Sequence, residues 1–303
     1  MLAQSRWRVH LHLAVMQRLH STRRATAFLF ALATVVVSSS CVTNPATGNR
    51  QLNLLSRDQE IALGEQAMTQ LTQQYDGAVA DPALAAYVQR VGERVAATVE
   101  SEYDDLPWEF TLLDSEAINA FALPGGKVFI TLGLASRMTN EAQLAATLGH
   151  EIGHVTAEHA DKRISNNLIV STVLSGAATA AGGSQEALIR NAIPRIVDAA
   201  GKGFLLKFSR DEELEADSLG MRYMTSAGYD PRGMLQLMQV LEEEAASSSR
   251  NLEFFSTHPH PARRIDQIKT KLNKKRYQRA MVDGEHDFKE AQFRRDFLAR
   301  LQR

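Results

Sequence analysis

Apolar residues recur at helical spacing along the chain from Ser56 to Glu100. They fall three and four positions apart, which places them on one face of an α-helix. Asp81-Pro82 divides this stretch, because aspartate caps a helix start and proline fits the first turn. The pattern therefore predicts two helices, one on each side of this pair.

Two later segments have the composition of strands. Residues Trp108–Leu113 predict one strand. In residues 117–134, Pro124-Gly125-Gly126 supplies a tight turn, and the residues after it are rich in β-branched and aromatic side chains. This segment predicts a strand, a turn and a second strand.

Further helices are predicted in the second half of the chain. Asn140 begins a long one, others span about 209–227 and 232–247, and another follows Pro261. Helices thus surround one small sheet. This order predicts a mostly helical α+β domain over residues 56–270, with the sheet beside the helix that starts at Asn140.

The first forty residues have the pattern of an export signal. Arg23-Arg24 precede an apolar run of 13 residues, Ala25–Val37, which is too short to span a bilayer but suits a signal peptide. Cys41 follows small residues after this run, where a bacterial lipoprotein signal places the cysteine that is lipidated. We expect residues 1–40 to be a lipoprotein-type signal and residues 41–55 a polar tether. A generic signal with an unmodified cysteine is the alternative.

The composition of the remaining chain indicates an ordinary globular protein. The sequence has 303 residues, 44% hydrophobic and 23% charged. Residues 1–40 hold five arginines and no acid, so the rest carries 29 Lys+Arg against 35 Asp+Glu, a net charge of −6. A mildly acidic body has no footprint for nucleic acid. Residues 271–303 are rich in lysine and arginine and predict a charged helical C-terminal extension.

The sequence His150-Glu151-Ile152-Gly153-His154 has the spacing of a zinc site. Residues four apart lie on one helical face, one turn apart, so both imidazoles can reach a single ion. Glu151 stands beside His150, and a carboxylate can take a proton from water whose pKa zinc has lowered. The pattern predicts one zinc per chain and Glu151 as the catalytic base.

A catalytic zinc usually has a third protein ligand. His159 is the nearest candidate, but the pattern that uses a nearby third histidine places it six residues after the second, with a glycine between them. His159 is five residues after His154, so we expect it to be structural or solvent-facing. Glu213 and Asp217 are four apart in a predicted helix, so Glu213 can ligate zinc while Asp217 accepts a hydrogen bond from a ligand histidine. Glu215 is expected on a solvated face.

These segments together resemble the zinc peptidase family that contains HtpX, the CAAX prenyl protease and the periplasmic BepA- and LoiP-like proteases. The resemblance rests on His150–His154, followed 59 residues later by Glu213–Asp217. It extends to Asn119-Ala120-Phe121, Pro124-Gly125-Gly126, Ser256-Thr257-His258-Pro259 and Arg264-Ile265. It covers about residues 45–270.

The resemblance implies a zincin-like (gluzincin) fold and a role for each matched residue. His150, His154 and Glu213 are the expected zinc ligands, Glu151 the base, and Asp217 the carboxylate behind a ligand. The chain lacks the membrane helices of the HtpX branch and the repeat domain of BepA, so it is similar to the short lipoprotein branch.

The resemblance also implies a latch. In BepA-like relatives a histidine at the position of His258 can approach the zinc, where a fourth protein ligand displaces the catalytic water. We therefore expect His258 to keep the enzyme latent; the alternative is a loop histidine held in place by Pro259 and Pro261. Arg264 is expected to form ion pairs or to orient the substrate.

The second strand of the pair is the predicted substrate edge. An extended substrate would pair with it as an additional strand. The residues of this edge are Lys127, Val128, Phe129, Ile130 and Thr131. Such a cleft favours unfolded or partly assembled proteins. Tyr223, His260 and Arg264 are candidates for the group that stabilises the oxyanion.

The sequence thus predicts a zinc-dependent endopeptidase that degrades unfolded or misassembled envelope proteins. Its expected place is the bacterial periplasm, anchored through Cys41 to the inner leaflet of the outer membrane, with the envelope assembly machinery as a candidate partner. Two alternatives stay open. One is a chaperone or assembly factor with a latent or structural zinc site, and the other is an aminopeptidase, for which the sequence offers no clear acidic motif.

Overall fold

The computed structural model describes residues 41–175, 207–247, 253–258 and 262–301. The predicted signal segment 1–40 and the candidate residue His260 lie outside the described residues. No helix in the described ranges has the length and apolar character that crossing a membrane requires.

A three-stranded mixed sheet lies at the centre of the fold. Its strands are β3 (Glu109–Leu113), β4 (Ala120–Leu123) and β5 (Lys127–Thr131), in the order β3-β5-β4. Strand β5 pairs in parallel with β3 and antiparallel with β4. The predicted tight turn joins β4 to β5, and Gly125 and Gly126 both have positive φ there.

Helices and short segments complete the fold around this sheet. In chain order they are β1 (Cys41–Thr43), β2 (Arg50–Leu52), α2 (Arg57–Gln74), α3 (Pro82–Ala96), η1 (Ser101–Tyr103), α4 (Leu132–Ala135), α5 (Glu141–Thr156), α6 (His159–Ser175), α8 (Arg210–Ser226), α9 (Arg232–Ser247), α10 (Phe254–Thr257), α11 (Ala262–Leu272), α12 (Lys275–Ala280), α13 (Glu290–Phe293), η3 (Arg294–Leu298) and α14 (Ala299–Leu301). The helices and strands predicted between Ser56 and Leu272 are confirmed, including Asp81 and Asn140 as helix caps.

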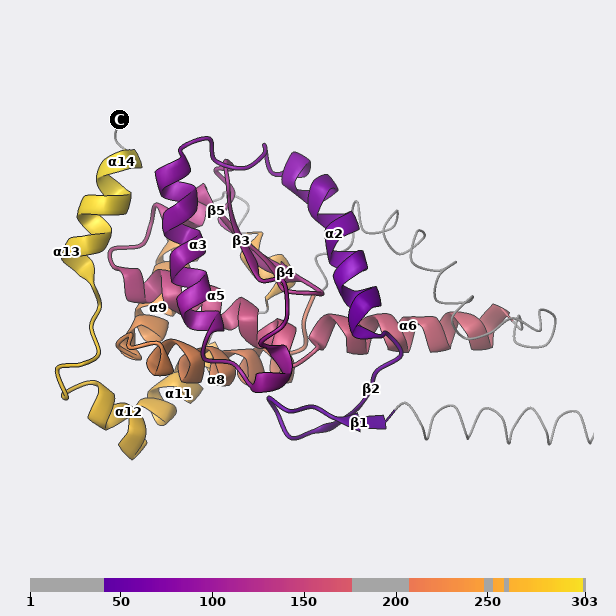
Figure 1. The fold of residues 1–303 in the computed structure, drawn as a ribbon. Coiled ribbons are helices and arrows are strands. Elements are labelled where there is room, and N and C mark those ends of the chain that lie inside the picture. Colours follow the sequence, from indigo (N-terminus) through magenta and orange to yellow (C-terminus); the bar gives the residue numbers. More distant parts are fainter. Residues whose placement is uncertain (1–40, 176–206, 248–252, 259–261, 302–303) are drawn as a thin grey trace, which may run out of the picture.

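Both faces of the sheet are covered, and Figure 1 shows α2 and α3 on opposite sides of it. Val128 and Ile130 of β5 point into the larger core, which α3 and α5 share. Phe129, between them, points into a smaller core with α2. Side chains alternate along a strand, so two covered faces require apolar residues at consecutive positions.

The structure corrects the prediction that Lys127–Thr131 forms the edge of a cleft. Strand β5 is the middle strand, and its two neighbours occupy the backbone hydrogen bonds on both sides. Lys127 is buried, with an exposed fraction of 7%, and its ammonium group donates to Glu109 at 3.1 Å and to the Pro107 carbonyl at 3.3 Å. The outer strands of this sheet are β3 and β4, and in the described ranges no further strand pairs with the outer side of β4.

Helices α5 and α8 approach to backbone contact at glycines. A Cβ added to Gly220 would lie 2.8 Å from the amide nitrogen of His150, and one added to Gly153 would lie 2.8 Å from the Ala216 carbonyl oxygen. These distances leave no room for a side chain. The glycine in the motif His150–His154 therefore serves helix packing, which brings residues of α8 against the histidines.

The range predicted as a tether folds onto the body. Strands β1 and β2 form an antiparallel hairpin. Between them, the Asn44 side chain donates to the Thr156 carbonyl at 2.8 Å and contacts the Tyr103 hydroxyl at 3.0 Å. The hairpin is thereby attached to the C-terminal end of α5 and is not a free linker.

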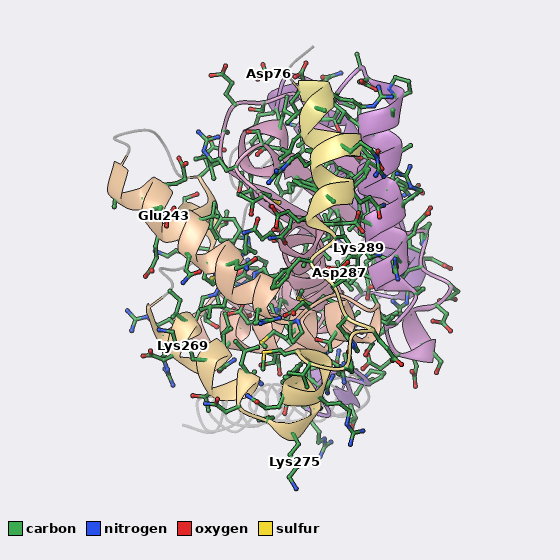
Figure 2. The ribbon with its side chains drawn as sticks, turned by 90° about the vertical axis from the view of Figure 1, so that its left-hand side faces the viewer. Asp76, Glu243, Lys269, Lys275, Asp287 and Lys289 are labelled. Carbon is green, nitrogen blue, oxygen red and sulfur yellow. The ribbon has the colours of Figure 1, made fainter. Side chains whose placement is uncertain are left out.

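The C-terminal segment 275–301 is largely helical and completes the core. Phe293 and Phe297 are fully buried and contact the ring of Tyr87 in α3. Figure 2 shows this last helix alongside α3, whereas Lys275 points away from the body. The folded unit therefore continues beyond residue 270.

Candidate metal centre

Two helices supply most of the site. Helix α5 starts at the side-chain cap of Asn140 and carries His150, Glu151 and His154 on its last turns. Helix α8 starts at a capping box formed by Ser209 and presents Glu213 and Asp217. All five functional side chains are buried, with exposed fractions of at most 3%.

Four side chains converge as a metal ligand set. Ligand atoms of His150, His154, Glu213 and His258 all lie within 4.8 Å of one another, and the described part of the chain contains no other such group. The Nε2 atoms of His150 and His154 are 3.1 Å apart, and each lies 3.5 Å from a Glu213 oxygen.

These separations fit zinc. A tetrahedral ion with ligands at about 2.0–2.1 Å requires donor atoms about 3.3–3.4 Å apart. Two imidazoles and a carboxylate are also a donor set that zinc favours. The structure thus brings together the three residues predicted as ligands.

His258 completes the group from a different element. It follows α10, and its Nδ1 lies 3.4 Å from His150 Nε2 and 2.9 Å from Glu213 Oε1. Its ring stacks on Phe254, with centroids 4.4 Å apart. The amide of Phe254 in turn donates to the Ile118 carbonyl, next to the edge strand β4, at 3.1 Å.

Asp217 and Arg264 lie behind the ligands. Asp217 Oδ1 is 2.9 Å from Nδ1 of His150, the atom that does not face the ligand group. Arg264 donates to both oxygens of Asp217 at 2.7 Å and lies 2.8 Å from Glu213. Arg264 is thus buried between two carboxylates, which matches the ion-pairing half of its prediction.

The charges in the site shift the pKa values of the ligands. Burial raises the pKa of Glu213, but the charges of His258 and Arg264 outweigh it and hold that pKa well below the usual value. Burial lowers the pKa of His154 far below normal. Burial and Arg264 also lower the pKa of His150, but hydrogen bonds to Asp217 and Glu213 outweigh them and raise it to about 9. A metal must displace a proton from His150 at neutral pH.

Glu151 differs from the other site residues in its hydrogen bonding. Neither of its carboxylate oxygens hydrogen-bonds to a described residue, although the side chain is fully buried. Burial raises its pKa, and the charge of His258 opposes this. The nearest ion-pairing atom is Nε2 of His258, 3.6 Å from Oε1. Glu151 is therefore held beside the ligand group with its oxygens available for chemistry.

Sequence reasoning missed that His159 and Glu215 contact the ligand histidine His154 in a row. His159 is completely buried, and its Nδ1 lies 2.8 Å from Nδ1 of His154. Glu215 lies 3.1 Å from the other nitrogen of His159. His159 reaches His154 because the helix breaks at Glu158, whose φ is +54°. Nothing in the sequence marks this break, because glutamate rarely adopts the left-handed region.

Tyr223, a candidate for oxyanion stabilisation, is committed elsewhere. Its hydroxyl donates to Glu100 at 2.7 Å and contacts the Thr156 hydroxyl at 3.0 Å. The Arg264 guanidinium is held by its two carboxylates, and His260 lies outside the described residues.

Comparisons with known proteins agree with this geometry. A profile of the family described as "Peptidase family M48" matches residues 82–272. The mitochondrial metalloendopeptidase OMA1 of Schizosaccharomyces pombe is 31% identical over 247 residues, covering 80% of this chain and 70% of that protein. The beta-barrel assembly-enhancing protease of Escherichia coli K12 is 30% identical over 258 residues, covering 83% of this chain. The chain spans 51% of that bacterial relative's length.

Proposed function

Because this chain belongs to peptidase family M48 and is a metalloendopeptidase, we propose that its metal is zinc and that its substrates are unfolded or misassembled envelope proteins. The family predicted from the sequence motifs is confirmed. The observation that supports the zinc assignment most strongly is the convergence of His150, His154 and Glu213 at distances that fit this ion.

The residues around the ion have separate roles in peptide hydrolysis. Bound zinc supplies a positive charge that polarises a carbonyl and lowers the pKa of water. Glu151 takes a proton from the attacking water and gives it to the leaving amine, which a carboxylate with raised pKa can do in both directions. Asp217 holds His150 in its orientation through Nδ1, and Arg264 holds Asp217 and Glu213 in place.

His258 keeps this arrangement latent in our proposal. Its Nδ1 stands where a fourth ligand would stand, and its Nε2 faces Glu151. One side chain thus obstructs both the open coordination position and the base. Catalysis requires the segment that carries His258 to move aside.

In this proposal the substrate pairs with the outer edge of β4, which pairs with no further described strand. The Thr131 amide donates to the Asn119 carbonyl at 3.0 Å. The backbone N–H and C=O groups of the odd-numbered residues of β4 therefore point toward β5. In an antiparallel ladder the residues between them direct their backbone groups outward. Ala120 and Ala122 therefore present N–H and C=O groups on the side where the described residues contain no further strand.

Replacing Ala122 with proline should lower kcat/KM for an unfolded protein by about tenfold, since it removes one outward donor and adds bulk at the edge. Ala122→Ser, which keeps the N–H, is the matched control and should stay near wild type. Wild-type kcat/KM in a folded, zinc-loaded Ala122→Pro chain would argue against pairing at β4.

The cellular place is inferred from the N-terminal pattern and the bacterial relative, whose name refers to β-barrel assembly. We propose a periplasmic protein anchored to the outer membrane through a lipid on Cys41, near the envelope assembly machinery. Cys41 begins the docked hairpin, so such an anchor would hold the domain close to the membrane.

Mass spectrometry of the mature N-terminus tests the anchor. The expected terminal residue is Cys41 with the mass of three acyl chains and a glyceryl group added. An unmodified Cys41, or a mature chain that begins elsewhere, would exclude it.

The proposed function itself is tested by measuring zinc content and casein cleavage in the wild-type chain and in Glu151→Gln. One zinc in both chains and cleavage only by the wild type is the supporting result. A wild-type chain that binds no zinc contradicts the proposal.

A further inference from the structure

A chain of hydrogen-bonding groups leads from the surface to one of the ligand histidines. The two Nδ1 atoms of His154 and His159 are 2.8 Å apart. Nε2 of His159 lies 3.1 Å from Glu215 Oε2, and the Asn49 side chain donates to the other oxygen of Glu215 at 2.8 Å. His154 Nε2 is the atom in the ligand group. Glu215, His159 and His154 therefore form one connected row that ends at the metal centre.

The protons in this row can be placed by elimination. An ionised carboxylate only accepts, so His159 carries a proton on Nε2. A neutral His159 then has its lone pair on Nδ1, and the proton between the rings belongs to Nδ1 of His154. This leaves the lone pair of His154 on Nε2, directed into the ligand group.

We propose that His159 and Glu215 are positioning residues that fix His154 in the tautomer whose Nε2 binds the metal. The proposal rests on the zinc centre proposed above and deepens it. A residue that accepts from the free nitrogen of a ligand histidine sets both the tautomer and the orientation of its ring.

The surroundings of the row hold its members in place. His159 is fully buried, and the Asn49 side chain holds the second oxygen of Glu215. Phe208 stacks on the ring of His154 with centroids 3.9 Å apart, so the ring plane is held while His159 selects the proton position.

The two ligand histidines are therefore supported differently. Asp217 places a negative charge directly on Nδ1 of His150, and Arg264 neutralises that charge from behind. His154 instead donates to the neutral ring of His159, and the carboxylate of Glu215 lies on the far side of that ring.

Zinc affinity tests the proposal, measured by chelator competition in the inactive Glu151→Gln background. His159→Leu should weaken zinc binding by about 10–100-fold, the usual cost of losing such a partner. His159→Asn should recover part of this loss, because its amide oxygen can accept from His154. Glu215→Gln should weaken binding less than His159→Leu, and Lys162→Gln, which removes only a charge 3.9 Å from Glu215, should bind as the background does.

A packing role predicts the opposite order. Leucine fills a buried space at least as well as asparagine, so packing alone would make His159→Leu the milder change. Wild-type affinity in His159→Leu, or no recovery in His159→Asn, would overturn the proposal. Thermal unfolding of the metal-free variants separates lost affinity from lost folding.

A direct readout does not need a destabilising variant. Long-range ¹H–¹⁵N spectra of the zinc-loaded Glu151→Gln chain should show protons on Nδ1 of His154 and Nε2 of His159. A proton on Nδ1 of His159 would overturn the proposal. Failure of the zinc centre itself would appear differently, as a wild-type chain that binds no zinc.

Discussion

Replacing Glu151 with glutamine should lower the rate of cleavage of an unfolded protein by about 10²–10⁴-fold, the range that a positioned general base contributes. Glutamine has nearly the same shape but cannot take a proton. The native carboxylate is buried, has no hydrogen-bond partner among the described residues and has a raised pKa, so proton transfer is the role that its surroundings favour. Zinc content should stay at one per chain, because Glu151 is not in the ligand group.

Glu243→Gln is the matched control for this variant. It makes the same chemical change on the exposed side of α9, where Figure 2 shows Glu243 far from the core, and should cleave at the wild-type rate. Cleavage by Glu151→Gln at a rate near wild type would remove Glu151 from the mechanism. If the wild-type chain and Glu151→Gln both bind zinc and neither cleaves casein, a latent or chaperone role becomes the better explanation.

Replacing His258 with alanine should have the opposite effect and raise basal casein cleavage by about tenfold. That gain corresponds to a closed arrangement that outnumbers the open one by about ten to one. His258 stands both at the fourth ligand position and against Glu151, so its removal frees the two groups together. Initial rates at equal zinc loading measure the effect.

Two further variants serve as controls for this measurement. The double variant Glu151→Gln/His258→Ala should be inactive, which assigns any gained cleavage to the same centre. His286→Ala removes a partly buried histidine that pairs with Asp283 outside the ligand group, and it should leave the rate unchanged. Unchanged or lower cleavage in His258→Ala would contradict the latch.

The ligand set could be predicted because it depends on spacing within helices. His150 and His154, and likewise Glu213 and Asp217, are four apart, and both segments have strong helix-start signals that the structure confirms. One helical turn then determines which side chains share a face. The contact between the two helices could be predicted only from the family resemblance. It forms through Gly153 and Gly220, which are far apart in the sequence, so no local pattern indicates it.

The errors lie where local pattern is silent about tertiary neighbours. The strand Lys127–Thr131 is buried along its whole length, because both of its faces and both of its edges are covered by other parts of the fold. His159 was expected to be structural or solvent-facing, because the pattern with a nearby third histidine ligand places it six residues after the second. It is fully buried, so only the solvent-facing half of this prediction is wrong. The left-handed backbone of Glu158, held by hydrogen bonds from Gln51, Asn53 and Tyr103, brings His159 to His154.

The backbone contact between α5 and α8 gives the ligands of the centre unequal freedom. His150, His154 and Glu213 stand on two helices that touch at glycines, so these three donors separate only when the helices part. His258 follows a four-residue helix and can leave by local unfolding. Amide hydrogens of α5 and α8 should then exchange with the free energy of global unfolding, and those of α10 with a much smaller one. Retention of zinc and access to the base are therefore separate equilibria, and the second can shift without loss of the first.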